Sequence, residues 1–118
     1  MTMELDTFLN KLNAEPDTVT FDETMAVIDA LYHFTPTSFI NGSLNNEAGQ
    51  NNGSCKLFSF ARLHQLSQQQ TLSCFGDYYR KDVLENPDST DHQNIRNFMS
   101  TGWNGIDFRG EALTLKQG

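Results

Sequence analysis

The sequence predicts a mostly α-helical α+β fold, a single compact domain of about five helices with a small β element. A length of 118 residues is typical of one domain, so residues 1–118 are predicted to fold together. Apolar residues recur at helical spacing in several segments, whereas strand-like alternation is confined to two short ones. Nine Phe, three Tyr and one Trp predict an aromatic-rich core.

The first two helices are predicted from apolar stripes and a capping box. Apolar residues within 5–12 follow the i, i+3, i+4, i+7 spacing, and this helix is expected to end before Pro16. The second helix is predicted to begin at Thr20, because Glu23 follows three residues later as in a capping box. Pro36 is expected to stop it.

The central helix is predicted over Leu57–Leu66, which is apolar on most sides, with Ser54 as its N-cap. Ser67 and Gln70 form a capping pattern that opens a further helix. That helix is expected to continue to Asn86-Pro87 with Gly76 in its middle. A glycine there predicts the close approach of another backbone.

The last helix is predicted to open with the capping pair Thr90 and Gln93 and to end at Gly102. Two segments carry the β signal. The turn pair Asn41-Gly42 predicts a hairpin, and Trp103–Phe108 alternates apolar and polar residues.

The chain end, residues 114–118, is expected to fray.

The charge balance disfavours two classes of partner. Eight Lys plus Arg against fifteen Asp plus Glu give a net charge of −7, which repels a phosphate backbone and an anionic membrane surface. The sequence therefore predicts neither a nucleic acid nor a membrane as partner. It has no apolar run of transmembrane length and no signal-peptide pattern, so a cytoplasmic location is expected. Export by type III secretion stays open, because that route needs no cleavable signal.

The polar stretch Asn41–Lys56 is the first candidate site, since it holds five Asn and three Gly. A connection this long and polar in a compact domain usually has a function. It leads into the central helix, whose unpaired first-turn N–H groups could bind an anion or a carboxylate. The alternative is that its residues only satisfy turns and the helix cap. The candidate binding residues here are Asn46, Gly49, Asn51, Gly53, Ser54 and Lys56.

A second polar cluster contributes His92 and Arg96, which are i, i+4 neighbours at the border of an apolar stripe. Arg96 could clamp a carboxylate, although an internal ion pair is the favoured interpretation. Trp103 is an aromatic residue of the kind found in binding hot spots, and we expect it near these two. The predicted partner is a protein or a small anionic ligand. The oligomeric state is left open.

Cys55 is the one candidate nucleophile. It lies in the first turn of the predicted central helix, where the macrodipole would lower the pKa of the thiol. With His33, His64 or His92 as base it would make a thiol-dependent hydrolase or transferase. The alternative is a small buried residue. No histidine pair has metal-ligand spacing, so neither a metal nor a cofactor is predicted, and a non-enzymatic binding module is favoured.

Three segments carry a family resemblance: NEAGQNNGSCK (46–56), CFGDYYR (74–80) and HQNIRNFM (92–99), the last followed by Gly102-Trp103. With them, the run from Phe21 to Leu113 resembles the HopJ type III effector proteins of Proteobacteria. The resemblance implies a small protein made in the bacterial cytosol, and the family name implies delivery into a host cell. It implies no catalytic residues, so it supplies a context and no mechanism.

Overall fold

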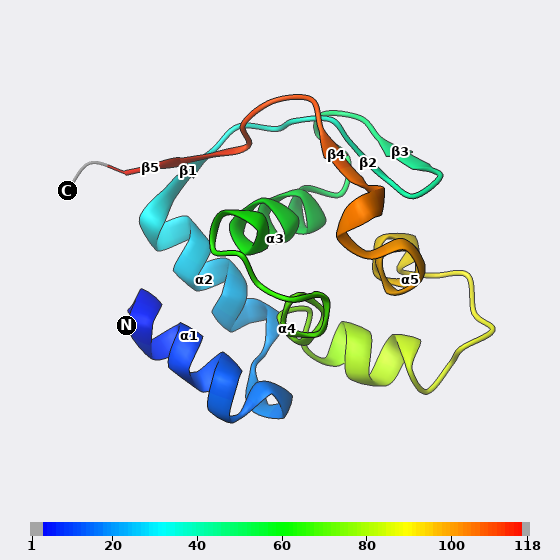
Figure 1. The fold of residues 1–118 in the computed structure, drawn as a ribbon, viewed down its shortest axis with the longest axis horizontal. Coiled ribbons are helices and arrows are strands. Elements are labelled where there is room, and N and C mark those ends of the chain that lie inside the picture. Colours follow the sequence, from blue (N-terminus) through cyan, green and yellow to red (C-terminus); the bar gives the residue numbers. More distant parts are fainter. Residues whose placement is uncertain (1–3, 117–118) are drawn as a thin grey trace.

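A computed structural model describes residues 4–116 and confirms the mostly helical α+β fold. Helix α3 lies in the middle, with α1 and α2 on one side, α5 on the other and the strands along one edge (Figure 1). The helical elements are α1 (Leu5–Ala14), η1 (Pro16–Thr18), α2 (Phe21–Leu31), α3 (Asn52–Leu63), α4 (Gln68–Ser73), η2 (Tyr78–Val83), α5 (Gln93–Thr101) and η3 (Gly102–Gly105). The strands are β1 (Tyr32–Phe34), β2 (Phe39–Asn41), β3 (Leu44–Asn46), β4 (Ile106–Phe108) and β5 (Leu113–Leu115).

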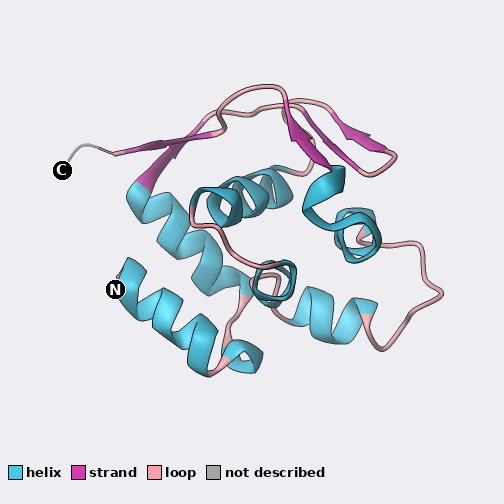
Figure 2. Ribbon diagram, in the orientation of Figure 1, coloured by secondary structure: helices cyan, strands magenta, loops and turns pink. Residues whose placement is uncertain are grey.

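The strands form two small antiparallel sheets, with the orders β1-β5 and β3-β2-β4, which lie over the helical layer (Figure 2). The expected fraying of residues 114–118 is wrong for the described part of that segment. Thr114 pairs with His33, and the Lys116 N–H donates to the Leu31 carbonyl at 2.8 Å. Residues 117 and 118 lie outside the described range.

The hairpin is present, but its turn is shifted by one residue from the predicted position. Asn41 pairs with Leu44 inside the ladder, so the turn is Gly42-Ser43 and Asn41-Gly42 is not the turn pair. Strand β4 was expected to begin at Trp103, whereas a 3₁₀ turn occupies Gly102–Gly105 first. No helix within residues 4–116 has both the length and the apolar character needed to cross a membrane.

An aromatic core surrounds α3. Phe58 is fully buried at its centre, and four rings lie with their centroids within 6.4 Å of the Phe58 ring: Phe39, Phe75, Phe98 and Trp103. Burying aromatic rings contributes much of the hydrophobic stabilisation of a small domain. Because α3 is held on several sides, its first turn occupies a defined position relative to α5.

A break at Gly76 divides what was predicted as one long helix. Helix α4 ends at Ser73, and the π-helical segment η2 begins only at Tyr78. Gly76 has a φ of +64°, and a Cβ at this position would lie 2.7 Å from the backbone nitrogen of Phe21. The close backbone approach is therefore confirmed, while the uninterrupted helix is wrong.

Two of the four predicted helix caps are confirmed. Thr20 with Glu23 and Ser67 with Gln70 both form complete capping boxes. The other two predicted caps are wrong. Helix α3 begins at Asn52, so Ser54 lies inside it, and α5 is preceded by His92, so Thr90 is not its N-cap.

Candidate functional site

A pocket of about 470 Å³ lies where the first turns of α3 and α5 meet. The chain before α3 folds back so that Asn51, Gly53 and Ser54 face the same hollow as His92. These four residues belong to the two polar clusters singled out in the sequence. The other lining residues are Phe21, Leu44, Phe75, Tyr78, Gln93, Asn94 and Ile95.

Both helices start at this pocket in the same unusual way. Their N-cap residues, Asn51 and His92, have left-handed backbone conformations with φ of 52° and 50°, and neither caps its helix with a side chain. The N–H groups of residues 52–54 and of residues 93 and 94 accordingly have no acceptor within residues 4–116. Two sets of unpaired donors, each at the positive end of a helix dipole, therefore border one pocket.

A network of asparagine amides fixes the polar side of the pocket. Asn94 donates from Nδ2 to Asn46 Oδ1 at 2.9 Å, and its own Oδ1 accepts from Asn46 and Asn41 at 3.1 and 3.0 Å. Asn51 donates to Asn46 Oδ1 at 2.6 Å, which ties the start of α3 to this network. Asn41, Asn46 and Asn94 are buried, so the network positions the two helix starts relative to each other.

The opposite side of the pocket is aromatic. Phe21 and Phe75 are stacked with centroids 6.2 Å apart, and the Tyr78 ring lies 5.2 Å from that of Phe21. The ring centroids of His92 and Tyr78 are 5.2 Å apart, and His92 Nε2 is 3.1 Å from Asp82 Oδ2. The pocket thus combines amide donors on one side with ring faces on the other.

The two cationic residues expected at the site are engaged elsewhere. Lys56 points to α2, where its Nζ pairs with Asp29 Oδ1 at 2.9 Å. Arg96 pairs with Asp91 Oδ1 at 2.7 Å and also donates to the carbonyl oxygen of Pro87. This internal pairing holds the pKa of Asp91 below its ordinary value. Neither Lys56 nor Arg96 lines the pocket.

Three other candidate residues also lie away from the pocket's lining. Asn46 is buried beneath it in the amide network. Gly49 lies in an exposed turn, where a Cβ would have no atom within 4 Å of it. Trp103 packs on Phe98 and donates from Nε1 to the Leu66 carbonyl at 3.0 Å, so it belongs to the core.

The sequence interpretation missed Asn94, which both lines the pocket and organises the amide network. A signal for it existed. Asn94 lies four residues before Phe98, a fully buried residue, so it occupies the buried side of α5. A polar residue on that side must find partners inside the protein.

The environment of Cys55 differs from that expected for a nucleophile. The side chain is 1% exposed, and its Sγ donates to the Thr37 carbonyl at 3.4 Å. Burial raises the pKa of the Cys55 thiol, so the expected lowering by the helix start is wrong. The described residues place no histidine in hydrogen-bond contact with it, since His64 bonds to Tyr32.

We expect both thiols to resist alkylation in the native protein. Burial also raises the pKa of Cys74, to about 12, so neither cysteine is a thiolate near neutral pH. Iodoacetamide labelling at pH 7.5, read by mass spectrometry, should be at least about tenfold slower than in urea. Rapid native labelling at Cys55 alone would contradict this and would reopen the nucleophile hypothesis.

Within residues 4–116, no group of three or more His, Cys, Asp or Glu side chains is placed to hold a metal ion. The pocket therefore offers backbone amides, side-chain amides and aromatic rings as its binding groups.

Comparison with known proteins gives the chain a family. Among solved structures, the crystal structure of VPA0580, a protein of unknown function, matches with a TM-score of 0.96 and 54% sequence identity over 98% of this chain and 97% of that one. No curated protein matches the sequence. The HopJ type III effector protein family matches residues 5–113, which include α1 to α5 and most of the strands. The chain therefore belongs to the HopJ type III effector protein family.

Proposed function

We propose that the chain is a non-enzymatic binding module whose pocket between α3 and α5 holds a small anion, such as a carboxylate or a phosphate group. The observation that carries the proposal is the meeting of two uncapped helix starts at one pocket. Each helix N-terminus acts as about half a positive charge, and its free N–H groups are directed donors.

The amide network supports a preformed site. Asn46 bonds to both Asn51 and Asn94. Asn51 is the residue before α3, and Asn94 is the second residue of α5. The donors are thus held in place before a ligand arrives, so little ordering entropy is lost on binding.

The same geometry limits the affinity. Lys56 and Arg96 are paired elsewhere, and Asp82 lies beside His92, so no free cationic side chain among the described residues faces the ligand. Binding then depends on backbone donors and dipoles, and we expect dissociation constants of about 1 mM for simple anions. The ring faces of Phe21 and Tyr78 favour a ligand that carries an apolar part beside its anionic group.

A substitution at Ser54 tests the site without removing a structural contact. In Ser54→Asp, a carboxylate in the first turn of α3 should occupy the donors itself and should also favour the helix dipole. We expect inorganic phosphate and acetate to shift the amide NMR signals of residues 52–54, 93 and 94 in the parent protein, and at least tenfold more weakly in Ser54→Asp.

Ser54→Ala is the matched control, since it keeps the backbone donors and should keep the affinity. Equal binding by the parent and by Ser54→Asp, or shifts elsewhere only, would contradict the proposal. The melting temperature of Ser54→Asp should be equal to or higher than that of the parent, which separates loss of binding from loss of fold.

We also propose, from family membership, that the chain is exported by type III secretion and acts outside the cell that makes it. A translocation reporter fused to the full chain tests this. Signal in the recipient cell that disappears in a secretion-deficient strain supports export, and equal signal in both strains contradicts it.

A further inference from the structure

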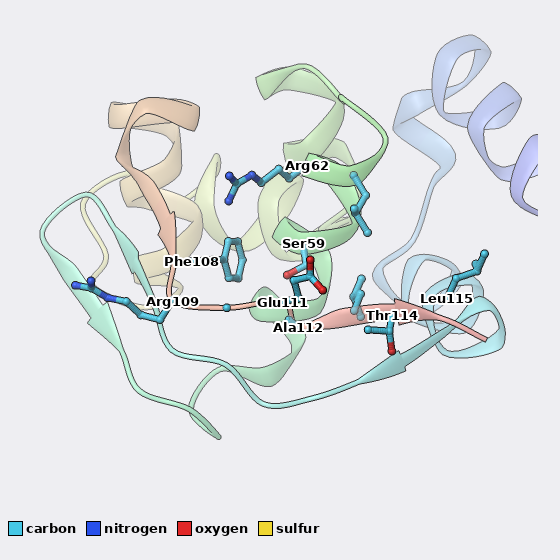
Figure 3. A pocket seen from close by; sticks show the side chains of 11 residues that line it. Ser59, Arg62, Phe108, Arg109, Glu111, Ala112, Thr114 and Leu115 are labelled. Atoms are coloured by element: carbon cyan, nitrogen blue, oxygen red, sulfur yellow. The ribbon is translucent and has the colours of Figure 1, made fainter. Parts of the chain in front are cut away.

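A second and larger hollow, of about 720 Å³, runs between the last turns of α3 and the chain from Phe108 to Leu115 (Figure 3). We name it the α3–β5 groove. It shares no lining residue with the pocket between α3 and α5. Its lining comes from three residues of α3, Ser59, Arg62 and Leu63, and from the segment Phe108–Leu115.

The α3–β5 groove contains the two basic side chains that have no partner among the described residues. Of eight Lys and Arg in an acidic protein, six make ion pairs or hydrogen bonds. The remaining two, Arg62 and Arg109, have guanidinium groups without a partner in the part of the chain that the structure describes. Both line the α3–β5 groove. With Glu111 as its one acidic lining residue, the groove is locally positive on a molecule of net charge −7.

Ser59 adds a free hydroxyl group to the groove. Its side chain lines the groove and is only 8% exposed. Its hydroxyl makes no hydrogen bond to any group within residues 4–116, although helical serines commonly bond to the preceding turn, as Ser73 does. Among the described residues Asn41 Oδ1 is the one buried side-chain polar atom without a partner, so the Ser59 hydroxyl oxygen is accessible from the groove and free to bond a ligand there.

The groove also offers apolar surface. Phe108 stacks on the buried Phe39 with centroids 5.1 Å apart and planes 24° apart, so Phe39 supports its ring from one side. Leu63 and Leu115 at the rim are 56% and 67% exposed, which is high for leucine. Arg62 extends from α3 toward the Phe108 ring (Figure 3).

We propose that the α3–β5 groove binds an amphipathic anion, a carboxylate or phosphate group attached to an aromatic body. Arg62, whose side chain lies by the Phe108 ring, binds the anionic group, because a guanidinium matches both oxyanions with paired donors. Arg109 extends away from Phe108 in Figure 3 and adds positive charge at that end of the groove. The Ser59 hydroxyl donates a further hydrogen bond, and the aromatic body packs against Phe108 and Leu63. The volume suits a small organic ligand.

Phenyl phosphate is the probe for the first experiment, an NMR titration of the full chain. We expect saturable shifts at residues 59–63 and 108–114, with a dissociation constant of about 1 mM or lower, the range open to a ligand of this size. Phenylacetate should shift the same signals, whereas phenylacetamide, its neutral analogue, should not.

Two variants test the assigned residues, and a third is the control. The double variant Arg62→Gln, Arg109→Gln should weaken phenyl phosphate binding at least tenfold. Ser59→Ala should weaken it several-fold without lowering the melting temperature, because it removes no existing hydrogen bond. Lys81→Gln is the charge-matched control for a single arginine, since Lys81 is exposed and lies in η2. It should bind as the parent does.

Three results would overturn the proposal: no saturable shift with phenyl phosphate, equal binding by the double arginine variant, or shifts confined to residues 52–54, 93 and 94. The last result would place the anion in the pocket between α3 and α5 and support the proposed function instead. Binding of a hexaglutamate peptide in the groove without binding of phenyl phosphate would assign the groove to a protein partner and also reject the small-ligand proposal.

Discussion

The Gly76→Ala variant is expected to unfold about 2 to 5 kcal/mol more easily than the parent protein. Two costs add at this position. The backbone has a φ of +64°, which an L side chain adopts at a cost of about 1 to 2 kcal/mol. The new Cβ would also lie 2.7 Å from Phe21 N and 3.1 Å from Thr20 Cα, and backbone atoms cannot turn aside. The start of α2 would have to move away from the end of α4.

Gly49→Ala is the matched control for this experiment. Gly49 also has a positive φ, of +95°, but no atom lies within 4 Å of where its Cβ would be. It should therefore show the cost of the backbone conformation alone. Urea denaturation followed by far-UV circular dichroism gives both free energies of unfolding. Equal losses in the two variants would show that the contact between Gly76 and Phe21 is relieved cheaply, contrary to expectation.

The Asn94→Ala variant is expected to lose about 2 to 4 kcal/mol of stability, since each buried group left without a partner costs about 1 to 3 kcal/mol. Removing the amide leaves Asn46 Nδ2 without its acceptor at 3.1 Å and takes from Asn46 Oδ1 its donor at 2.9 Å. Asn41 Nδ2 keeps its bond to the Asn94 carbonyl, so the hairpin retains one link to α5. The effect should be seen as a lowered melting temperature.

Asn45→Ala in the same hairpin is the control for Asn94→Ala. Asn45 is exposed, and its substitution should change the stability by less than about 0.5 kcal/mol. A loss below about 1 kcal/mol in Asn94→Ala would mean that water replaces the amide easily. By the same reasoning Asn46→Ala should be strongly destabilising. A loop residue that only contacts a ligand could be replaced without loss of stability, and the burial of Asn46 argues against that role.

The sequence was most informative where the determining contacts are local. The capping boxes at Thr20 and Ser67 close within three residues, so the residue types alone predict them. The apolar stripe of α1 is likewise visible in the sequence and is buried at Phe8 and Leu12. The existence of α1, α2 and the start of α4 followed from these patterns.

Features that depend on distant contacts could not be predicted in the same way. Strands β1 and β5 have three residues each, which is too few for an alternating pattern to be recognised. Each forms because it pairs with the other. The N-cap of α3 is Asn51 in a left-handed conformation, supported by its bond to Asn46 rather than by a local capping bond. Residue type favoured Ser54, and the tertiary contact decided otherwise.

The candidate site likewise has features that the sequence predicted and features that depend on distant contacts. The sequence indicated that the polar stretch before α3 and the start of α5 were unusual, and the fold does bring Asn51 and His92 to one pocket. Charge pairing could not be predicted, because Lys56 meets Asp29 only once α2 packs on α3. For the same reason no sequence pattern marked Arg62 and Arg109, which share a groove only in the folded chain.

The pairing of β1 with β5 has a consequence for how this protein is made. Strand β1 follows α2 directly, but its hydrogen-bonding partner is β5, so the sheet cannot close until the chain as far as Leu115 has left the ribosome. During synthesis the edge of β1 stays unpaired. The unpaired edge of β1 is therefore open to other strands for longer than that of the β2–β3 hairpin, whose two strands are close together in the sequence.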